Sequence, residues 1–206
     1  MTIIVKTIMN KAKKMYPKNE YKKMNKEAIE HLNKLEIENK DIPKAMKKHT
    51  DLCIFPAIAV YNTLINHNMP KEDAVDLISN FFTKLSGDGF KLVSLWLHLF
   101  GNYHRYPAKF VKNSFRDFSP EAGFKYELPK EKNPAVAKFD IIQCPYHDMC
   151  KKYNCIELNR AFCDSDDAKY GCLHPKLMWK RNGTLGKGAN CCDFSIVDIS
   201  RFKNEN

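Results

Sequence analysis

The stretch that decides the fold reads Leu177-Met178-Trp179-Lys180-Arg181, then Asn182-Gly183-Thr184-Leu185-Gly186-Lys187-Gly188, and, shortly after, Cys192-Asp193-Phe194-Ser195-Ile196-Val197-Asp198-Ile199. Two strand-like segments enclose a glycine-rich turn, which predicts a β-hairpin. Cys192 and Phe194 fall on one face of the second strand and are predicted to fill the core, whereas Asp193 falls on the other face. Gly188 is predicted to supply the positive φ that such a turn uses.

The segments before this hairpin predict the rest of a sheet. Phe124, Tyr126 and Leu128 alternate with charged residues, which is the two-residue period of a half-buried strand. A second strand and two short helices are then predicted at residues 136–143, 145–153 and 156–170. The second half of the chain therefore predicts an antiparallel sheet with short inserted helices.

The first half of the chain predicts helices. Apolar residues recur there at helical spacing, and Pro70 followed by Lys71-Glu72-Asp73 is typical of a helix start, because acids favour the positive end of the helix dipole. Pro56 is predicted to start or kink a buried helix, Gly87-Asp88-Gly89 to stop a helix, and Gly101-Asn102 to end the next one. The predicted helices cover residues 25–39, 52–61, 71–86 and 90–100.

The predicted fold class is α+β, with an N-terminal helical layer packed on a C-terminal antiparallel sheet. We expect a single domain over residues 1–206, in which residues 1–106 are mainly helical and residues 107–206 hold the sheet and a cysteine-rich site. A chain of 206 residues with 44% hydrophobic content is able to bury a substantial core, which excludes a disordered chain.

The formal net charge of +10 does not by itself indicate nucleic-acid binding. Much of the excess lies in Lys13-Lys14, Lys22-Lys23 and Lys47-Lys48, interspersed with glutamates, a pattern typical of a solvated helix surface. We therefore predict no nucleic-acid partner. No apolar run approaches the ~20 residues that span a bilayer, and the first residues lack the pattern of a secretory signal, which favours a cytoplasmic protein without a membrane partner.

Seven of the eight cysteines lie between Cys144 and Cys192. In a chain without an export signal these cysteines are expected to be free thiols rather than disulfides. One hypothesis is that some of them bind zinc. The candidate ligands are Cys144, His147, Cys150, Cys155, Cys172 and His174. Because no Cys-x2-Cys pair is present, we predict no metal and no cofactor, and structural zinc stays as an alternative.

A second hypothesis is that Cys163 is a catalytic nucleophile. It opens the segment Cys163-Asp164-Ser165-Asp166, which predicts a helix start, and a helix N-terminus stabilises thiolate over thiol. Asp166 follows one turn later, where it could orient a base or activate water. Nearby carboxylates oppose this activation because they raise a thiol pKa. A third hypothesis is that Cys163 is a buried core residue and that Asp164 and Asp166 only cap the helix.

Four motifs occur in order, namely Phe162-Cys163-x2-Asp166, Leu173-His174-Pro175, Trp179-Lys180-Arg181-x2-Thr184-Leu185-x2-Gly188 and Cys192-Asp193-Phe194. Together they resemble the L-2-amino-thiazoline-4-carboxylic acid hydrolase family over roughly residues 108–197. The resemblance implies a hydrolase of cysteine metabolism. Such an enzyme opens the cyclic isothiourea of L-2-amino-thiazoline-4-carboxylate and yields N-carbamoyl-cysteine.

The resemblance also implies roles for single residues. Cys163 is the candidate attacking thiolate, Asp166 the partner of the amidine-like nitrogens, and Asp166 or His174 the base that activates water. Whether catalysis is covalent through Cys163 or water-based stays open. A cation is expected opposite the substrate carboxylate. The candidate substrate-binding residues are Arg181, Thr184, Arg105 and His104.

A weaker likeness supports a different class of function. Gly188-x3-Cys192-x-Phe194, after a hairpin turn, is similar to the end of vinyl-reductase-type small-molecule-binding domains. That likeness implies a pocket between the helical layer and the sheet of a non-catalytic sensor or carrier. Both readings share a small-molecule partner, and both leave the oligomeric state open.

Overall fold

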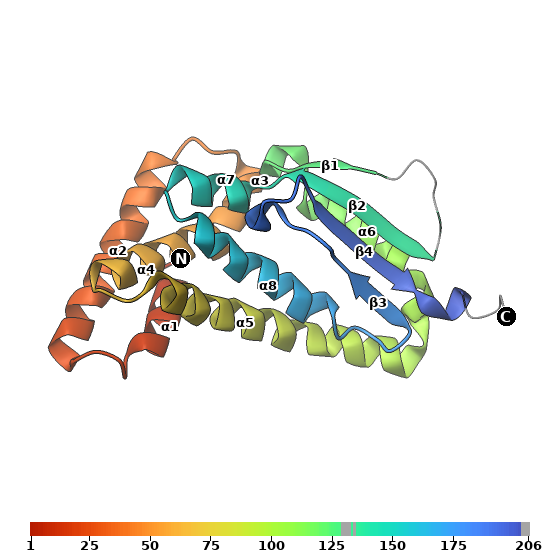
Figure 1. Ribbon diagram of the computed structural model, residues 1–206, viewed down its shortest axis with the longest axis horizontal. Helices are drawn as coiled ribbons and strands as arrows, with labels where there is room; N and C mark the ends of the chain where they lie inside the picture. The colour runs from red at the N-terminus through yellow and green to blue at the C-terminus, as the bar shows by residue number, and fades with distance from the viewer. Residues whose placement is uncertain (129–132, 134, 203–206) are drawn as a thin grey trace.

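The computed structural model describes residues 1–128, 133 and 135–202, and it has the predicted α+β class (Figure 1). Helices make up the N-terminal part, and a four-stranded antiparallel sheet lies in the C-terminal part. The long helix α5 (Lys71–Phe100) runs beside α8 (Asn159–Tyr170) from one part to the other. Within the described residues, no helix is long and apolar enough to cross a bilayer.

The N-terminal helices pack around α4 (Phe55–Asn66), which is apolar on all sides and buried over most of its length. Pro56 lies in the first turn of α4, as predicted, and directly follows a π-helical turn at residues 50–54, in which the Phe55 N–H donates to the Thr50 carbonyl oxygen. The neighbouring elements are α1 (Thr2–Ala12), α2 (Lys18–Glu38), α3 (Lys44–His49) and the π-helical turn η1 (Thr50–Ile54).

The prediction that Gly87 and Gly89 stop a helix is wrong. The helix α5 continues through both glycines, and Gly101 ends it with a φ of +61°, as predicted. Each glycine inside a helix costs about 1 kcal/mol relative to alanine, and the packing of α5 along α8 offsets this cost. An ion pair of 2.6 Å between Lys91 and Asp88 adds a local contact in the same region.

The boundary predicted after residue 106 falls inside a helix. Pro107 lies in the first turn of α6 (Tyr106–Asp117), which follows the short turn η2 (Asn102–Arg105) and packs against the sheet. The remaining helical elements are η3 (Pro120–Ala122), α7 (Pro145–Lys152), η4 (Ile156–Leu158), α8, η5 (Leu185–Lys187) and η6 (Ile199–Arg201).

The sheet has the strand order β1-β2-β4-β3, and neighbouring strands are antiparallel. The predicted hairpin is confirmed as β3–β4, and β2 pairs with the other edge of β4, with Phe139 opposite Phe194. Burial alternates along β4, so Cys192 and Phe194 face the core and Asp193 does not. The strands are β1 (Lys125–Glu127), β2 (Val136–Gln143), β3 (Leu177–Lys180) and β4 (Cys192–Asp198).

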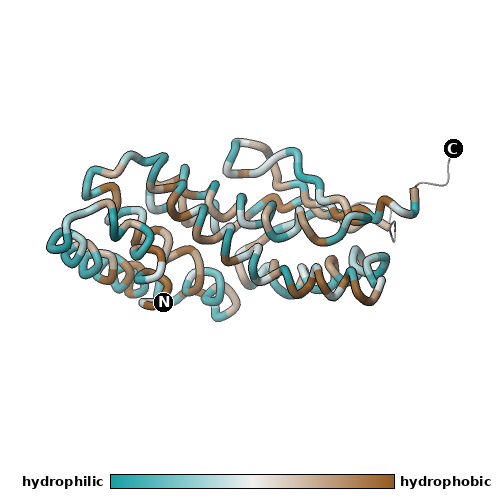
Figure 2. Tube along the Cα trace, turned by 90° about the horizontal axis from the view of Figure 1, so that it is seen from below, coloured by the Kyte–Doolittle hydropathy of each residue, from teal (hydrophilic) through white to brown (hydrophobic). Residues whose placement is uncertain are grey.

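Two hydrophobic cores form, one among the N-terminal helices and one beneath the sheet. The first core extends to Phe162 of α8, and the second gathers Phe110 of α6 with Phe139 and Phe194 of the sheet. Tyr146 of α7 packs against both cores. Figure 2 shows hydrophobic and hydrophilic residues alternating along the helices, as expected for helices that bury one face.

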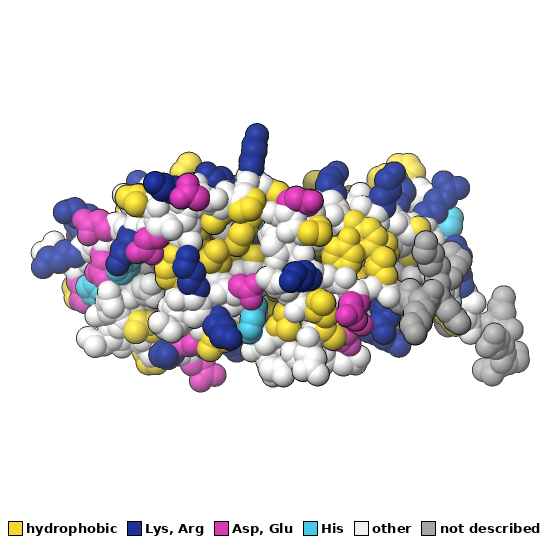
Figure 3. Space-filling model, turned by 90° about the horizontal axis from the view of Figure 1, so that it is seen from above, with side chains coloured by type: hydrophobic (Ala, Val, Ile, Leu, Met, Phe, Trp, Pro, Cys, Tyr) yellow, Lys and Arg dark blue, Asp and Glu magenta, His cyan; other side chains and the backbone are white. Residues whose placement is uncertain are grey.

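Charged side chains of both signs are interspersed on the face shown in Figure 3. On α2, ion pairs join Lys26 to Glu30 and Lys34 to Glu38 at i,i+4 spacing. The lysines of this helix therefore lie on a solvated surface, as the sequence predicted.

Candidate active site

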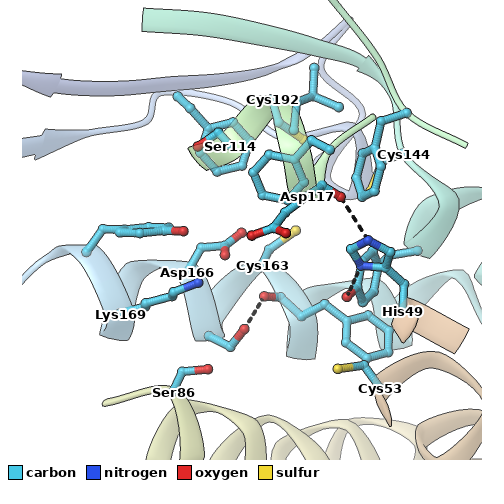
Figure 4. Close-up of a pocket in the computed structure, with 18 of the residues that line it drawn as sticks. His49, Cys53, Ser86, Ser114, Asp117, Cys144, Cys163, Asp166, Lys169 and Cys192 are labelled. Carbon is cyan, nitrogen blue, oxygen red and sulfur yellow. Dashed lines mark hydrogen bonds between the residues drawn. The ribbon is translucent and has the colours of Figure 1, made fainter. Parts of the chain in front are cut away.

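A cavity of about 600 Å³ lies between the two cores, where the helical layer meets the sheet (Figure 4). Side chains from α3, η1, α5, α6, α7, α8 and β4 line it. The predicted pocket at this junction is thus confirmed. Concave sites of this size, with mostly apolar walls and a few converging polar groups, are typical of small-molecule binding.

Cys163 and Asp166 both line this cavity. They lie one turn apart on α8, and their side chains rise from the helix into the space below α6 (Figure 4). The helix start predicted at Cys163 is wrong, because α8 begins at Asn159 and Cys163 lies in its second turn. Asp164 does not cap the helix, since its carboxylate accepts a hydrogen bond of 2.9 Å from Ser79 of α5.

The Cys163 thiol is protonated at neutral pH. Its pKa is raised to about 12, chiefly by burial and also by the negative charge of Asp166. The charge of Arg181 and a contact with the Thr184 hydroxyl lower the pKa, and Asn159 Nδ2 donates to the sulfur at 3.7 Å, but burial outweighs them. Away from a helix N-terminus, Cys163 therefore lacks the environment that makes a reactive thiolate.

The Asp166 carboxyl titrates close to neutrality. Burial raises its pKa from 3.8 to about 6, whereas the positive charges of Lys169 and Arg181 act to lower it. The side chain is 28% exposed, but this surface faces the cavity rather than bulk water. A carboxylate with this pKa is ionised at pH 7 and still basic enough to accept a proton from water, which suits a general base.

Arg181 and Thr184 stand behind the side chains that line the cavity. The Arg181 side chain is only 5% exposed, and its Nη2 donates to Asp167 Oδ2 (2.6 Å) and to the carbonyl oxygen of Cys163 (3.0 Å). Its Nη1 lies 3.7 Å from Asp166 Oδ2. Thr184 is buried near the Cys163 thiol, and its hydroxyl has no hydrogen-bond partner among the described residues. Arg181 and Thr184 are therefore placed to stabilise α8 rather than to contact a ligand in the cavity.

A family model described as L-2-amino-thiazoline-4-carboxylic acid hydrolase matches residues 1–196. The chain belongs to the L-2-amino-thiazoline-4-carboxylic acid hydrolase family. The match extends beyond the motif region at residues 108–197 to the N-terminal helices, which carry no distinctive motif of their own. No curated protein and no solved structure matches the chain.

Besides Arg181 and Thr184, three further residues predicted for the site do not line the cavity. His174 precedes β3, where its ring stacks on Tyr103 with centroids 4.4 Å apart and lies 4.6 Å from the ring of His98. His104 and Arg105 are exposed in η2. The cavity geometry therefore gives no support to roles for His174, His104 or Arg105 in this candidate site.

Sequence reasoning did not point to His49, which lines the cavity. His49 Nε2 donates to the carbonyl oxygen of Asp117 (2.9 Å), and Nδ1 accepts from the Tyr146 hydroxyl (3.0 Å). Burial lowers the pKa of His49, so the ring is neutral near pH 7. It follows Lys47 and Lys48 in a run that predicts a solvated helix surface, and no sequence pattern marks its burial.

Lys169 is a second cavity residue that sequence reasoning missed. Its Nζ lies 4.7 Å from the ring centre of Phe90 and 4.9 Å from that of Tyr170. The sequence does contain a pattern that points to Lys169. Cys163, Asp166 and Lys169 are spaced by three residues and therefore share one face of a helix.

The candidate zinc ligands do not come together. Cys150 and Cys155 are buried in the first core, whereas Cys172 is exposed after the end of α8. Across residues 1–128, 133 and 135–202, no three His, Cys, Asp or Glu side chains are grouped to hold a metal ion. The zinc alternative therefore lacks its ligand set in the described part of the chain.

We expect Asp166→Asn to stabilise the folded protein at pH 8. The folded state binds the Asp166 proton more tightly than the unfolded chain does, so stability falls as pH rises from about 4 to about 6 and stays reduced above that range. The Asn variant avoids this cost, which is up to about 3 kcal/mol at pH 8 and close to zero near pH 4. Urea unfolding at both pH values measures the difference.

The matched control for this prediction is Asp167→Asn. Asp167 accepts hydrogen bonds from Arg181 and from Trp179 Nε1 (2.8 Å), so its neutralisation is expected to destabilise the protein by about 1–2 kcal/mol at pH 8. Destabilisation of the same size by both substitutions would contradict the assigned environment of Asp166.

Proposed function

We propose that this protein is a cytoplasmic hydrolase of cysteine metabolism that opens the ring of L-2-amino-thiazoline-4-carboxylate or a close cyclic isothiourea. Family membership supports the reaction class. The observation that carries the proposal is the Asp166 carboxylate, which has a pKa of about 6 and opens with Cys163 into one cavity.

In the proposed reaction, water adds to the electrophilic carbon C2 of the ring, and Asp166 accepts the proton that the water loses. The C2–S bond then breaks, and the sulfur leaves with the bonding electron pair. The leaving sulfur takes the proton back from Asp166 and becomes a thiol. When the water adds, the electron pair of the C=N bond moves onto the ring nitrogen. The hydroxyl that stays on C2 gives its proton to this nitrogen as the urea carbonyl forms, so the product is N-carbamoyl-cysteine and one water is consumed.

Lys169 is the proposed partner of the substrate carboxylate. It lines the cavity on the same face of α8 as Asp166, and its charge already acts on Asp166. Arg181, which with Arg105 was one of the two cations expected from sequence, pairs with Asp166 and Asp167 and is almost fully buried. We therefore assign Arg181 a positioning role and Lys169 the charge-assisted contact with the ligand.

The pKa of Cys163 favours the water route over the covalent route. A thiol with a pKa of about 12 is almost entirely protonated at pH 7, and the thiolate is the nucleophilic form. We expect Cys163→Ala to keep ring opening within about tenfold of the parent protein, because removal of the sulfur leaves Asp166 and its water in place.

The test follows thiol release from the thiazoline with a colorimetric reagent, for the parent protein and for Cys163→Ala. Steady release by both supports the water route, and release by the parent alone supports a covalent one. A non-catalytic sensor or carrier on the same fold would bind the thiazoline without releasing thiol, which would overturn the proposed function.

A further inference from the structure

We infer that the substrate carries a flat apolar group, such as an aromatic ring, beyond the small ring that reacts. This inference rests on the proposed function for the reacting end of the cavity. A cavity of about 600 Å³ is in the size range that encloses drug-sized ligands. The bare thiazoline is one five-membered ring with two small substituents, so it leaves most of that volume unfilled.

The unfilled part of the cavity is bounded by rings in mutual contact, which we name the aromatic wall. Neighbouring ring centres are 4.9 to 5.6 Å apart, the spacing at which aromatic pairs stabilise one another. In order of contact, the aromatic wall consists of Phe82, Phe162, Tyr146, His49, Phe124 and Phe118.

The polar groups of the aromatic wall are already used within the protein. Both ring nitrogens of His49 are engaged, one by the Asp117 carbonyl oxygen and the other by the Tyr146 hydroxyl. Burial raises the pKa of Tyr146 well above its ordinary value and lowers that of His49, so both rings stay neutral. Against these rings, a polar extension of the ligand would lose its hydrogen bonds to water, whereas an apolar ring loses none.

Two cavity thiols continue this apolar surface. Cys53 of η1 and Cys144 before α7 line the cavity, and burial raises the pKa of each. A protonated, buried cysteine behaves as a small hydrophobic residue. These thiols therefore extend the surface that an apolar group would contact.

The reacting groups and the aromatic wall occupy opposite ends of one space. In Figure 4, Asp166 and Lys169 lie at one end, His49 and Cys53 at the other, and Cys163 between them. A ligand whose reacting carbon lies at Asp166 and whose carboxylate lies at Lys169 therefore directs further substituents toward the aromatic wall. The wall sets specificity by shape and apolar contact, while Asp166 sets the chemistry.

The experiment separates binding from turnover with stable analogues. The aromatic 2-aminothiazole-4-carboxylate keeps the shape of the substrate but resists ring opening, and a second probe carries an added phenyl group at C5. Calorimetry with the full-length protein is expected to show at least tenfold tighter binding of the phenyl probe. Cys53→Phe, which fills the aromatic end, is expected to remove that preference, and Cys53→Ala, which does not fill it, is expected to retain it.

Equal or weaker binding of the phenyl probe to the parent protein overturns this inference, whatever happens to the thiazoline itself. A preference for the phenyl probe that Cys53→Phe removes supports it. A preference for the phenyl probe in a protein that releases no thiol from L-2-amino-thiazoline-4-carboxylate supports this inference while overturning the proposed function. The parent protein alone decides the first comparison, so the inference stays testable if Cys53→Phe fails to fold.

Discussion

Asp166→Asn is expected to lower kcat/KM for thiazoline ring opening by a factor of about 10² to 10⁴, the usual contribution of a general base. Asparagine keeps the shape of the side chain, but its amide does not accept the proton of the attacking water. The loss should fall on kcat, because the base acts in the transition state more than in the bound ground state. Thiol release measured over a range of substrate concentrations separates kcat from KM.

Asp164→Asn is the matched control for this loss. Asp164 lies on the same helix but bonds to Ser79 of α5, so its neutralisation should change kcat/KM by less than about threefold. Ring opening by Asp166→Asn at a rate within threefold of the parent protein would remove Asp166 from the mechanism. Equal rates for Asp166→Asn and Asp164→Asn would likewise show that Asp166 does not act as the base.

Arg181→Met is expected to destabilise the protein by about 3 kcal/mol, since it removes a buried cation from two carboxylates and from the Cys163 carbonyl oxygen. The same change should raise the pKa of Asp166, because the Arg181 charge now acts to lower it. The acid limb of the activity profile should therefore move to higher pH. Urea unfolding and kcat/KM across pH measure the two effects.

Arg181→Lys distinguishes charge from geometry. Lysine keeps the positive charge but does not reproduce the forked contacts of Nη1 and Nη2. We expect it to restore the position of the acid limb while recovering only part of the lost stability. An acid limb that stays in place in Arg181→Met would contradict the positioning role of this residue.

The sheet was predictable from sequence because its signals are local. The β3–β4 hairpin and the strand β2 follow from alternation and from the turn glycines, and their bounds lie within a residue or two of the predictions. Gly101 ends α5 for a local reason as well, since it adopts a positive φ. The prediction that the helix stops at Gly87 and Gly89 failed because α5 packs along α8, a contact between distant segments. This packing outweighs the helix-destabilising effect of the two glycines.

The site was predictable only in part, because the order of motifs along the sequence does not determine which of their residues lie close together in the folded protein. Cys163 and Asp166 come together through helical spacing alone, which a sequence reveals. His174 belongs to the same motif set, yet the chain turns away after α8 and stacks it on Tyr103. His49 enters from the other half of the chain, and only tertiary packing places it beside Tyr146.

The most direct test is kcat/KM for thiol release from L-2-amino-thiazoline-4-carboxylate by the parent protein between about pH 5 and pH 8. We predict a plateau above the Asp166 pKa of about 6 and a tenfold fall per pH unit well below it, because the protonated carboxyl accepts no proton. Absence of thiol release, or a rate that does not fall below pH 6, would contradict a reaction driven by the Asp166 carboxylate.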